Sequence, residues 1–336
     1  MKAVKFYGIG DVRTVDVPAV VPDGDQALIQ ALYGGICGSD LHIYRKGMFV
    51  RGTGETMGHE FVGRVLSAPA GCALEAGNLV VGDPRVPCGH CQACLEGETQ
   101  RCAQLGFIGE VRPGCFAQLL ALEPEKLIPL SPGTDLRQAA LCEPLAVAVH
   151  ACKGIVKNNP RRVLVVGAGP IGLLIACLLK KLHRTEWVCV AERDGFRRSF
   201  AASAGADQAA AELSEAGRGF DCAVDAVGAP GVLDGMLSAV RPGGSIFVSA
   251  IYESLPEFDI NTLVSNEQQL LGNNAYSFAD LKEAARLVET RAVELDWLIT
   301  RVLPAGQAAE AFRLLTAKEK SDLKILLDFR APDITT

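Results

Sequence analysis

The sequence predicts an α/β protein in which a β-rich domain is followed by a parallel sheet flanked by helices. Short apolar runs punctuated by glycine and proline fill residues 1 to about 145, and this spacing is typical of a compact β-barrel. From residue 162, apolar strands alternate with helical segments, which indicates βαβ units and a parallel sheet. A chain of 336 residues, 49% of them hydrophobic, is long and apolar enough for about two domains.

In the first part of the chain, strands are expected where apolar residues lie between turn-forming residues. The clearest such runs cover residues 27–38, 60–70, 78–86 and 116–130. Near residue 137 the pattern changes, because an alanine-rich stretch over 137–155 predicts a helix instead.

The second part repeats strand and helix in turn. Strands are expected at 162–169, 187–193, 220–228, 245–251 and 268–274, with helices at 170–182 and 196–205. The tail from about residue 276 predicts a helix, a strand, a helix and a last strand, over 278–290, 299–303, 308–318 and 323–329. No internal repeat or low-complexity tract interrupts this order.

Composition disfavours several classes of function. The net charge is −6, and lysine and arginine form no stripe, so neither nucleic acid nor an anionic membrane is an expected partner. No stretch approaches the roughly 20 apolar residues of a membrane-spanning helix, and the first residues lack the apolar run of a secretion signal. Twelve cysteines in such a chain indicate a reducing compartment, so we expect a cytoplasmic protein.

Four cysteines lie close together in the segment PCGHCQACLEGETQRC. Cys88, Cys91 and Cys94 are separated by two residues each, and Cys102 follows after seven more. Four thiolates at this spacing can hold a zinc ion tetrahedrally and leave no position for water or substrate, which is typical of a structural site. We therefore expect a structural zinc lobe at residues 85–105, with an iron–sulfur cluster or disulfides as the alternatives.

A glycine-rich turn, VLVVGAGPIG, lies between a predicted strand and a predicted helix. In this context Gly167 allows a tight turn, Gly169 lets the backbone approach a pyrophosphate, and Gly172 lets the helix pack closely on the strand. The helix N-terminus then offers N–H groups to the phosphates. Glu192, twenty residues after the last glycine, lies where a carboxylate binds the ribose hydroxyls of the adenosine. The sequence thus predicts a Rossmann domain that binds a dinucleotide.

The identity of the dinucleotide depends on charges at the end of the second strand of that domain. The carboxylate of Glu192 repels a 2′-phosphate and favours NAD, whereas Arg193, Arg197 and Arg198 could hold one. We expect NAD rather than NADP. The candidate cofactor-binding residues are Gly167, Gly169, Pro170, Ile171, Gly172, Glu192, Arg193 and Arg197.

A second set of metal-binding residue types is spread over the first part of the chain. The segment GGICGSDLHIY contributes Cys37, and MGHEFVGRV contributes His59 and Glu60. A further carboxylate, Glu143, lies in LCEPLAVAVHA. A thiolate, an imidazole and a carboxylate with one open position are the arrangement of a catalytic zinc. We therefore expect two zinc ions per chain.

Taken in order, these motifs resemble one protein family. GICGSDLH, GHE, the four-cysteine segment, CEPLAVAVHA and VVGAGPIG together are similar to the zinc-dependent medium-chain alcohol and polyol dehydrogenases, over nearly the whole chain. The resemblance implies a β-rich, chaperonin-10-like catalytic domain at 1–145 and 276–336, with the Rossmann domain inserted at 146–275. It also implies a homo-oligomer, either a dimer or a tetramer.

The resemblance also implies roles for the residues of the catalytic site. Cys37 and His59 match ligands of the catalytic zinc, and Glu60 matches an acid that binds the metal directly or through water. Ser39 and His42 match positions of a proton relay, and Glu143 matches a carboxylate near the metal. Asp40 matches an acid that positions a ligand.

The implied reaction is hydride transfer between a small polar secondary alcohol and NAD(P). A polyol, sugar alcohol or cyclitol is expected; DLHIY and VRPGCFAQ also resemble L-threonine 3-dehydrogenases, and a vicinal diol is a further alternative. Glu110 and Arg112 are candidate specificity residues in a loop expected to border the pocket. The intact set of zinc ligands argues against a zinc-free quinone reductase of the same fold and against a regulatory NAD-binding protein.

Overall fold

The computed structural model describes residues 1–330, and the chain divides into two compact units. One unit runs from Met1 to Glu143 and resumes at Ser277, and the other comprises Pro144–Tyr276. The last six residues, which the sequence assigned to the catalytic domain, lie outside the described part. No helix among residues 1–330 is long and apolar enough to cross a membrane.

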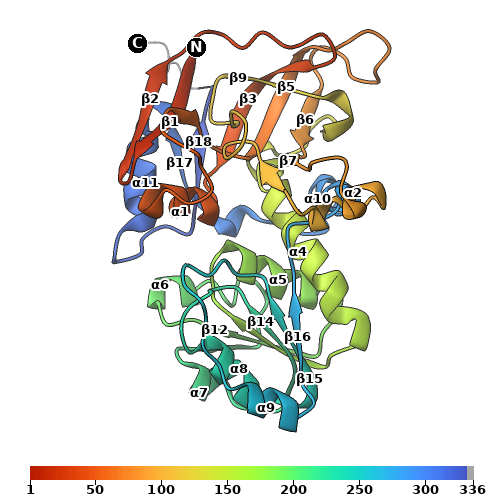
Figure 1. Cartoon of the computed structure of the whole chain (residues 1–336), viewed down its shortest axis with the longest axis vertical. Helices are drawn as coiled ribbons and strands as arrows, with labels where there is room; N and C mark the ends of the chain where they lie inside the picture. Colours follow the sequence, from red (N-terminus) through yellow and green to blue (C-terminus); the bar gives the residue numbers. More distant parts are fainter. Residues whose placement is uncertain (331–336) are drawn as a thin grey trace. The chain divides into compact units, whose positions relative to one another are not determined.

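The first unit is rich in β-structure, as the sequence predicts (Figure 1). In its described residues, the largest sheet has the strand order β10-β6-β5-β3-β18-β17, with β9 also paired to β3. These strands are β3 (Ala27–Gly35), β5 (Glu60–Ser67), β6 (Leu79–Gly82), β9 (Leu119–Leu122), β10 (Leu127–Pro129), β17 (Ile299–Pro304) and β18 (Lys324–Asp328). A second sheet contains β1 (Lys2–Gly8), β2 (Asp11–Asp16) and β4 (Glu55–Thr56).

The pairing of β18 with β3 joins the last part of the described chain to the first. The two strands are antiparallel, with Leu326 opposite Gly35. On its other edge β3 pairs with β5, where Gly35 lies opposite Glu60. The beginnings of β5 and β18 therefore meet at the end of β3, two residues before Cys37. This register positions the candidate metal ligands.

Helix α11 (Ala308–Thr316) covers β2 and β18 and stabilises the same region (Figure 1). Its buried residues follow the spacing of one helix face, and they are Ala308, Ala311, Phe312 and Leu315. The ring of Phe312 lies 5.4 Å from the ring of Tyr44, which belongs to helix α1 (Gly38–Lys46). Packing on α11 therefore fixes the helix that follows Cys37.

The second unit contains a six-stranded parallel sheet in the order β13-β12-β11-β14-β15-β16. The strands are β11 (Arg162–Val166), β12 (Trp187–Ala191), β13 (Gln208–Ala210), β14 (Phe220–Asp225), β15 (Val240–Val248) and β16 (Gln269–Gly272). After β13 the chain returns to place β14 on the free side of β11, and the order reverses there, as in a Rossmann sheet. Ligands bind at the carboxyl ends of the strands at such a point. The predicted parallel α/β domain is confirmed.

The helix predicted over 137–155 is divided in two. A short α3 (Leu136–Ala139) ends before α4 (Cys142–Ile155) begins. Pro144 lies in the first turn of α4, where its missing N–H removes no intrahelical bond and its fixed φ suits the helix. Proline thus marks where the longer helix starts, and the alanine-rich pattern alone did not reveal the break.

The helix predicted over 196–205 is shorter than expected. Only Gly195–Arg198 forms a helix, α6. The amides of Phe200 and Ala201 then bond to carbonyls three residues back, which makes tight turns rather than an α-helix. The sequence prediction also omitted β13, whose three residues are too short to show a period.

Candidate active site and cofactor site

Cys37 lies in extended backbone immediately before α1. Its amide donates a hydrogen bond of 2.9 Å to Oδ2 of Asp40, three residues later, so the acid fixes the turn that presents the thiol. Asp40 is 1% exposed. Its other oxygen, Oδ1, is buried without a hydrogen-bond partner among residues 1–330 and lies 4.0 Å from Nδ1 of His59. Asp40 therefore faces both candidate ligands.

His59 follows a glycine that lets the chain bend. Gly58 has φ of +90°, and a Cβ there would overlap the buried ring of Phe116, so the position requires glycine. The His59 side chain is 6% exposed, and its ring lies edge-on to Phe107 at 5.7 Å. Asp40 lies on the Nδ1 side of the ring, so a metal held by Nε2 would have the carboxylate–histidine arrangement that orients such ligands.

The side chains of Cys37, His59 and Glu60 converge. One ligand atom from each lies within 4.8 Å of the other two. Burial opposes protonation of His59, but the charges of Cys37 and Asp40 outweigh it and raise the pKa of His59 well above its usual value. The three converging side chains therefore provide surroundings that favour a positive charge. A thiolate, an imidazole and a carboxylate also fit zinc by donor type.

Glu60 forms a buried ion pair that the sequence analysis missed. Its carboxylate oxygens lie 2.6 and 2.5 Å from Nζ of Lys324, and both side chains are at most 1% exposed. Lys324 also donates to the carbonyl of Ile36 at 2.9 Å. A Cβ on Gly35 would overlap the Glu60 carboxylate. The only sequence signal was a lysine at the start of the apolar run KILL.

Glu143 lies in the first turn of α4 and is 6% exposed. Its charge acts to raise the pKa of His59 and of Lys324, which places it near both groups. It is absent from the set of three described residues whose ligand atoms lie within 4.8 Å of one another. Its predicted role near the metal stays a prediction.

The predicted relay residues, Ser39 and His42, both lie on α1 and are partly buried. The His42 ring is edge-on to Phe49 at 6.5 Å. Because α1 begins directly after Cys37, the helix keeps both side chains within a turn or two of a candidate zinc ligand. Their role in proton transfer stays a prediction.

The two predicted specificity residues lie in different surroundings. Gly109 is pressed against the backbone of Gly58, since a Cβ there would lie 2.8 Å from its N and O atoms, so Glu110 lies beside the His59 segment. Burial raises the pKa of Glu110 to about 7, while His59 acts in the opposite direction. Arg112 instead is exposed and pairs with Glu123 at 3.2 Å. Only Glu110 lies near the candidate metal ligands.

The four cysteines of the predicted lobe also converge. All four Sγ atoms lie within 4.8 Å of one another, with 3.5 Å between Cys91 and Cys94 and 4.0 Å between Cys88 and Cys94. Tetrahedral zinc with 2.3 Å bonds needs about 3.8 Å between sulfurs. Amides of Cys88 and Gln104 donate to Sγ of Cys102 and lower its pKa. All twelve cysteines are free thiols, and the cluster fits a structural zinc.

The glycine-rich turn has the geometry that a pyrophosphate requires. Gly167 has φ of +104°, and a Cβ on Gly172 would overlap the Gly167 carbonyl. A Cβ on Gly169 would meet no protein atom within 4 Å, so the space beside it is open to a ligand. Helix α5 (Pro170–Lys181) begins there with Pro170 and Ile171 in its first turn. Its free N–H groups can bind phosphate.

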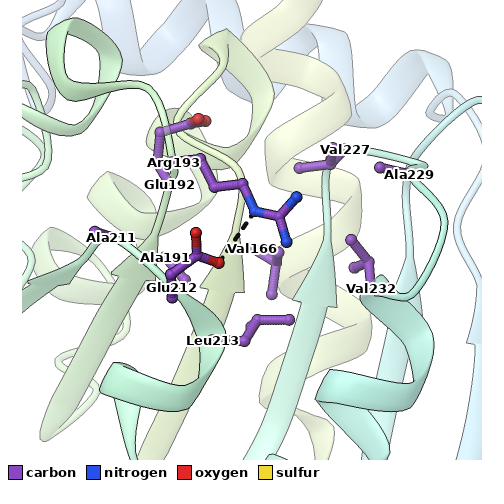
Figure 2. A pocket seen from close by; sticks show the side chains of 10 residues that line it. All are labelled: Val166, Ala191, Glu192, Arg193, Ala211, Glu212, Leu213, Val227, Ala229 and Val232. Carbon is purple, nitrogen blue, oxygen red and sulfur yellow. Dashed lines mark hydrogen bonds and ion pairs between the residues drawn. The ribbon is translucent and has the colours of Figure 1, made fainter.

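Glu192 connects this turn to the end of β12. Its Oε2 accepts the amide of Ala168 and its Oε1 accepts the amide of Asp194, each at 2.9 Å. These bonds hold the carboxylate at the carboxyl end of the sheet. The adjacent pocket has an apolar interior and a charged rim (Figure 2); it is lined by Val166, Ala191, Glu192, Arg193, Ala211, Glu212, Leu213, Val227, Ala229 and Val232.

The three arginines near Glu192 have different partners. Arg198 donates to the carbonyls of Glu192 and Arg193 at 2.8 and 3.0 Å, so its charge secures the loop. Arg197 belongs to α6 but does not line the pocket. Arg193 lines the pocket and pairs with Glu212 at 3.1 Å. The sequence analysis missed Glu212, which no motif marks.

Two family models match the two parts of the chain. Residues 23–132 match the model of the alcohol dehydrogenase GroES-like domain, and residues 137–329 match that of the glucose dehydrogenase C-terminus. The chain is 31% identical to 2-dehydro-3-deoxy-L-galactonate 5-dehydrogenase of Pseudoalteromonas atlantica, over 93% of this chain and 94% of that protein. It is 30% identical to the probable D-xylulose reductase A of Aspergillus terreus, with 93% and 94% covered.

A solved structure shares the same fold. It is a short chain alcohol dehydrogenase from Escherichia coli CFT073 complexed with NADH, with a TM-score of 0.90, 25% identity, and 98% of this chain and 99% of that chain covered. Together with the two domain matches and the relatives, it confirms the resemblance drawn from the motifs. The chain belongs to the zinc-dependent medium-chain dehydrogenase/reductase family and is an oxidoreductase of its alcohol and polyol dehydrogenase branch.

Proposed function

We propose that the chain catalyses zinc-dependent hydride transfer between a small polar secondary alcohol and NAD. A polyol, sugar alcohol or cyclitol is the proposed substrate class. The convergence of Cys37, His59 and Glu60 carries the proposal, because three protein ligands leave a fourth position for the substrate oxygen. The names of the relatives, a sugar-acid dehydrogenase and a xylulose reductase, support this substrate class.

The residues of the site have different proposed roles in the reaction. When bound, zinc supplies a Lewis acid that lowers the pKa of a bound hydroxyl. Asp40 holds the Cys37 turn and faces His59, so it orients both ligands. Ser39 and His42 are the proposed path for the proton that the hydroxyl loses, and Glu143 is the proposed carboxylate holding water near the metal. Glu110 is the proposed acceptor for a second hydroxyl of the substrate.

The proposal includes two zinc ions and a preference for NAD over NADP. The second zinc is assigned to Cys88, Cys91, Cys94 and Cys102, whose sulfur spacing supports it. The NAD preference is supported by the fixed carboxylate of Glu192 at the pocket rim. Assembly as a dimer or tetramer and a cytoplasmic location remain predictions from the sequence.

A substrate panel tests the reaction. The zinc-loaded chain is assayed by NADH absorbance with polyols, cyclitols, sugar alcohol phosphates, vicinal diols and 3-hydroxy amino acids. We expect the highest kcat/KM with a neutral polyol or cyclitol. Highest activity with L-threonine or a simple vicinal diol supports the corresponding alternative, and no turnover with any member contradicts the proposed class.

A ligand variant tests the site itself. Cys37→Ala should reduce turnover by at least about a thousandfold, since removal of a zinc ligand removes the metal's charge from the transition state. NADH binding, measured by calorimetry, should change little, because the glycine-rich turn lies in the other unit. Cys72→Ala removes a partly buried thiol outside both clusters and is the matched control. Near-normal activity of Cys37→Ala rules out the assigned zinc site.

A further inference from the structure

The rim of the pocket beside Glu192 carries one ion pair whose role the fold does not explain. Nε of Arg193 donates to Oε2 of Glu212 at 3.1 Å. Arg193 follows β12 by two residues and Glu212 follows β13 by two residues, so the pair connects the ends of neighbouring strands. In Figure 2 the Arg193 side chain extends from the Glu212 side of the pocket towards Val227.

The ion pair with Glu212 fixes the position of the Arg193 guanidinium at the rim of the pocket. Nη1 of Arg198 donates to two backbone carbonyls, and neither Arg197 nor Arg198 lines the pocket. Among the residues lining this pocket, Arg193 is the single cation, and Glu192 and Glu212 are the acids. A ligand at the rim therefore meets a guanidinium whose Nε edge already bonds a carboxylate.

We propose that Glu212 strengthens the preference for NAD over NADP by holding Arg193 across the pocket. The inference rests on the proposed NAD preference and names a residue that enforces it. A 2′-phosphate is bound well by an arginine that offers two parallel N–H groups. Arg193 cannot offer the edge containing Nε while that group bonds Glu212. The 2′-phosphate of NADP then meets two carboxylates and an arginine that keeps only its Nη1–Nη2 edge free and whose charge is already partly offset by Glu212.

The expected effect is limited by solvent. The side chains of Arg193 and Glu212 are 81% and 51% exposed, and exposed ion pairs of this kind are weak. Release of Arg193 should therefore change the ratio of NADH to NADPH affinity by up to about fivefold. The residue sets a preference rather than an absolute exclusion, and the main repulsion stays with Glu192.

Calorimetry on the zinc-loaded full chain tests this directly. The dissociation constants of NADH and NADPH are measured for the natural chain, Glu212→Gln, Arg193→Gln and the double variant. Glu186→Gln is the matched control, because Glu186 pairs with Arg161 at 2.7 Å on an exposed surface outside the pocket. We expect Glu212→Gln to lower the NADPH dissociation constant several-fold and to leave that for NADH within about twofold.

The double variant separates Arg193 from simple charge removal. If Arg193 is the released group, Glu212→Gln should have little effect on NADPH binding in the Arg193→Gln background. An equal gain in both backgrounds, or no gain in the natural background, overturns the inference. A natural chain that binds NADPH at least as tightly as NADH contradicts the proposed NAD preference instead, so the two failures are distinguishable.

Discussion

At the scale of single residues, the Glu60 carboxylate lies next to both the candidate metal ligands and a buried lysine. It converges with Cys37 and His59, and it also pairs with Lys324 in surroundings that exclude water. A buried charge without a partner is costly, and a paired one roughly offsets its desolvation. Lys324 therefore holds the Glu60 carboxylate in place, and we infer that it is a positioning residue for the candidate metal site.

Lys324→Met should lower the free energy of unfolding by about 3–5 kcal/mol, because it leaves Glu60 buried and unpaired. Urea titration of the zinc-free and zinc-loaded chain measures this. The loss should be smaller with zinc, since the ion supplies the missing positive charge. The double variant Glu60→Gln with Lys324→Met is the control and should recover much of the loss. Equal instability of both variants contradicts the assignment.

The sequence could reveal the candidate metal ligands but not the Glu60–Lys324 pair. Cys37, His59 and the four-cysteine segment belong to short motifs whose residue types and spacing indicate metal binding. Glu60 and Lys324 are 264 residues apart and meet only because β18 pairs with β3. A strand pairing of that kind depends on the whole fold, and no local pattern records it. The sequence did not reveal the Arg193–Glu212 pair either, because the two residues meet only where β12 and β13 lie side by side.

At the scale of elements, five of the six strands of the parallel sheet could be predicted because each contains a continuous apolar run, and the short β13 was missed. The side-chain contacts that join these strands at the amino ends of β11 and its neighbours could not be predicted from the sequence. Asp221 of β14 accepts the amides of Arg161 and Arg162, at the start of β11, at 2.8 and 2.9 Å. It also accepts Nε of Arg241 in β15 at 2.7 Å. One carboxylate thus joins three strands of the sheet.

Asp221→Asn should destabilise the chain at pH 7 by about 1–2 kcal/mol, through weaker hydrogen bonds from the two amides and Arg241. Burial opposes ionisation of Asp221, but these bonds outweigh it and hold its pKa below the usual value. The contribution is therefore complete above the unfolded pKa of about 3.9 and is lost as pH falls through the lower folded pKa.

Urea titration at pH 7, 5 and 3 measures this dependence on pH. The gap between the natural chain and Asp221→Asn should be equal at pH 7 and 5 and smaller at pH 3. Asp16→Asn is the control, because Asp16 pairs with Lys2 but is 75% exposed, and it should change stability little at any pH. A gap for Asp221→Asn that widens towards pH 3 contradicts the assigned direction of the pKa shift.

At the scale of the whole molecule, the candidate catalytic metal site, the candidate structural metal site and the candidate nucleotide site use different residues. The two candidate zinc sites share no residue, although both lie in the unit that contains Met1. The cysteine cluster would fill all four positions of a tetrahedral ion, whereas the other group would leave one position free. The glycine-rich turn and the pocket beside Glu192 lie entirely in Pro144–Tyr276. Metal occupancy and nucleotide binding should therefore be separable by mutation.

Metal analysis of variants tests that separation. The natural chain should contain two zinc ions, and His59→Ala and Cys94→Ser should each contain one, since each removes a ligand from one site only. Cys94→Ser should also lower thermal stability, because a structural zinc contributes directly to folding, whereas His59→Ala should mainly abolish turnover. Cys222→Ser alters a buried thiol outside both clusters and controls for loss of a cysteine. A single zinc in the natural chain, or iron in the cysteine cluster, contradicts the assignment of two zinc sites.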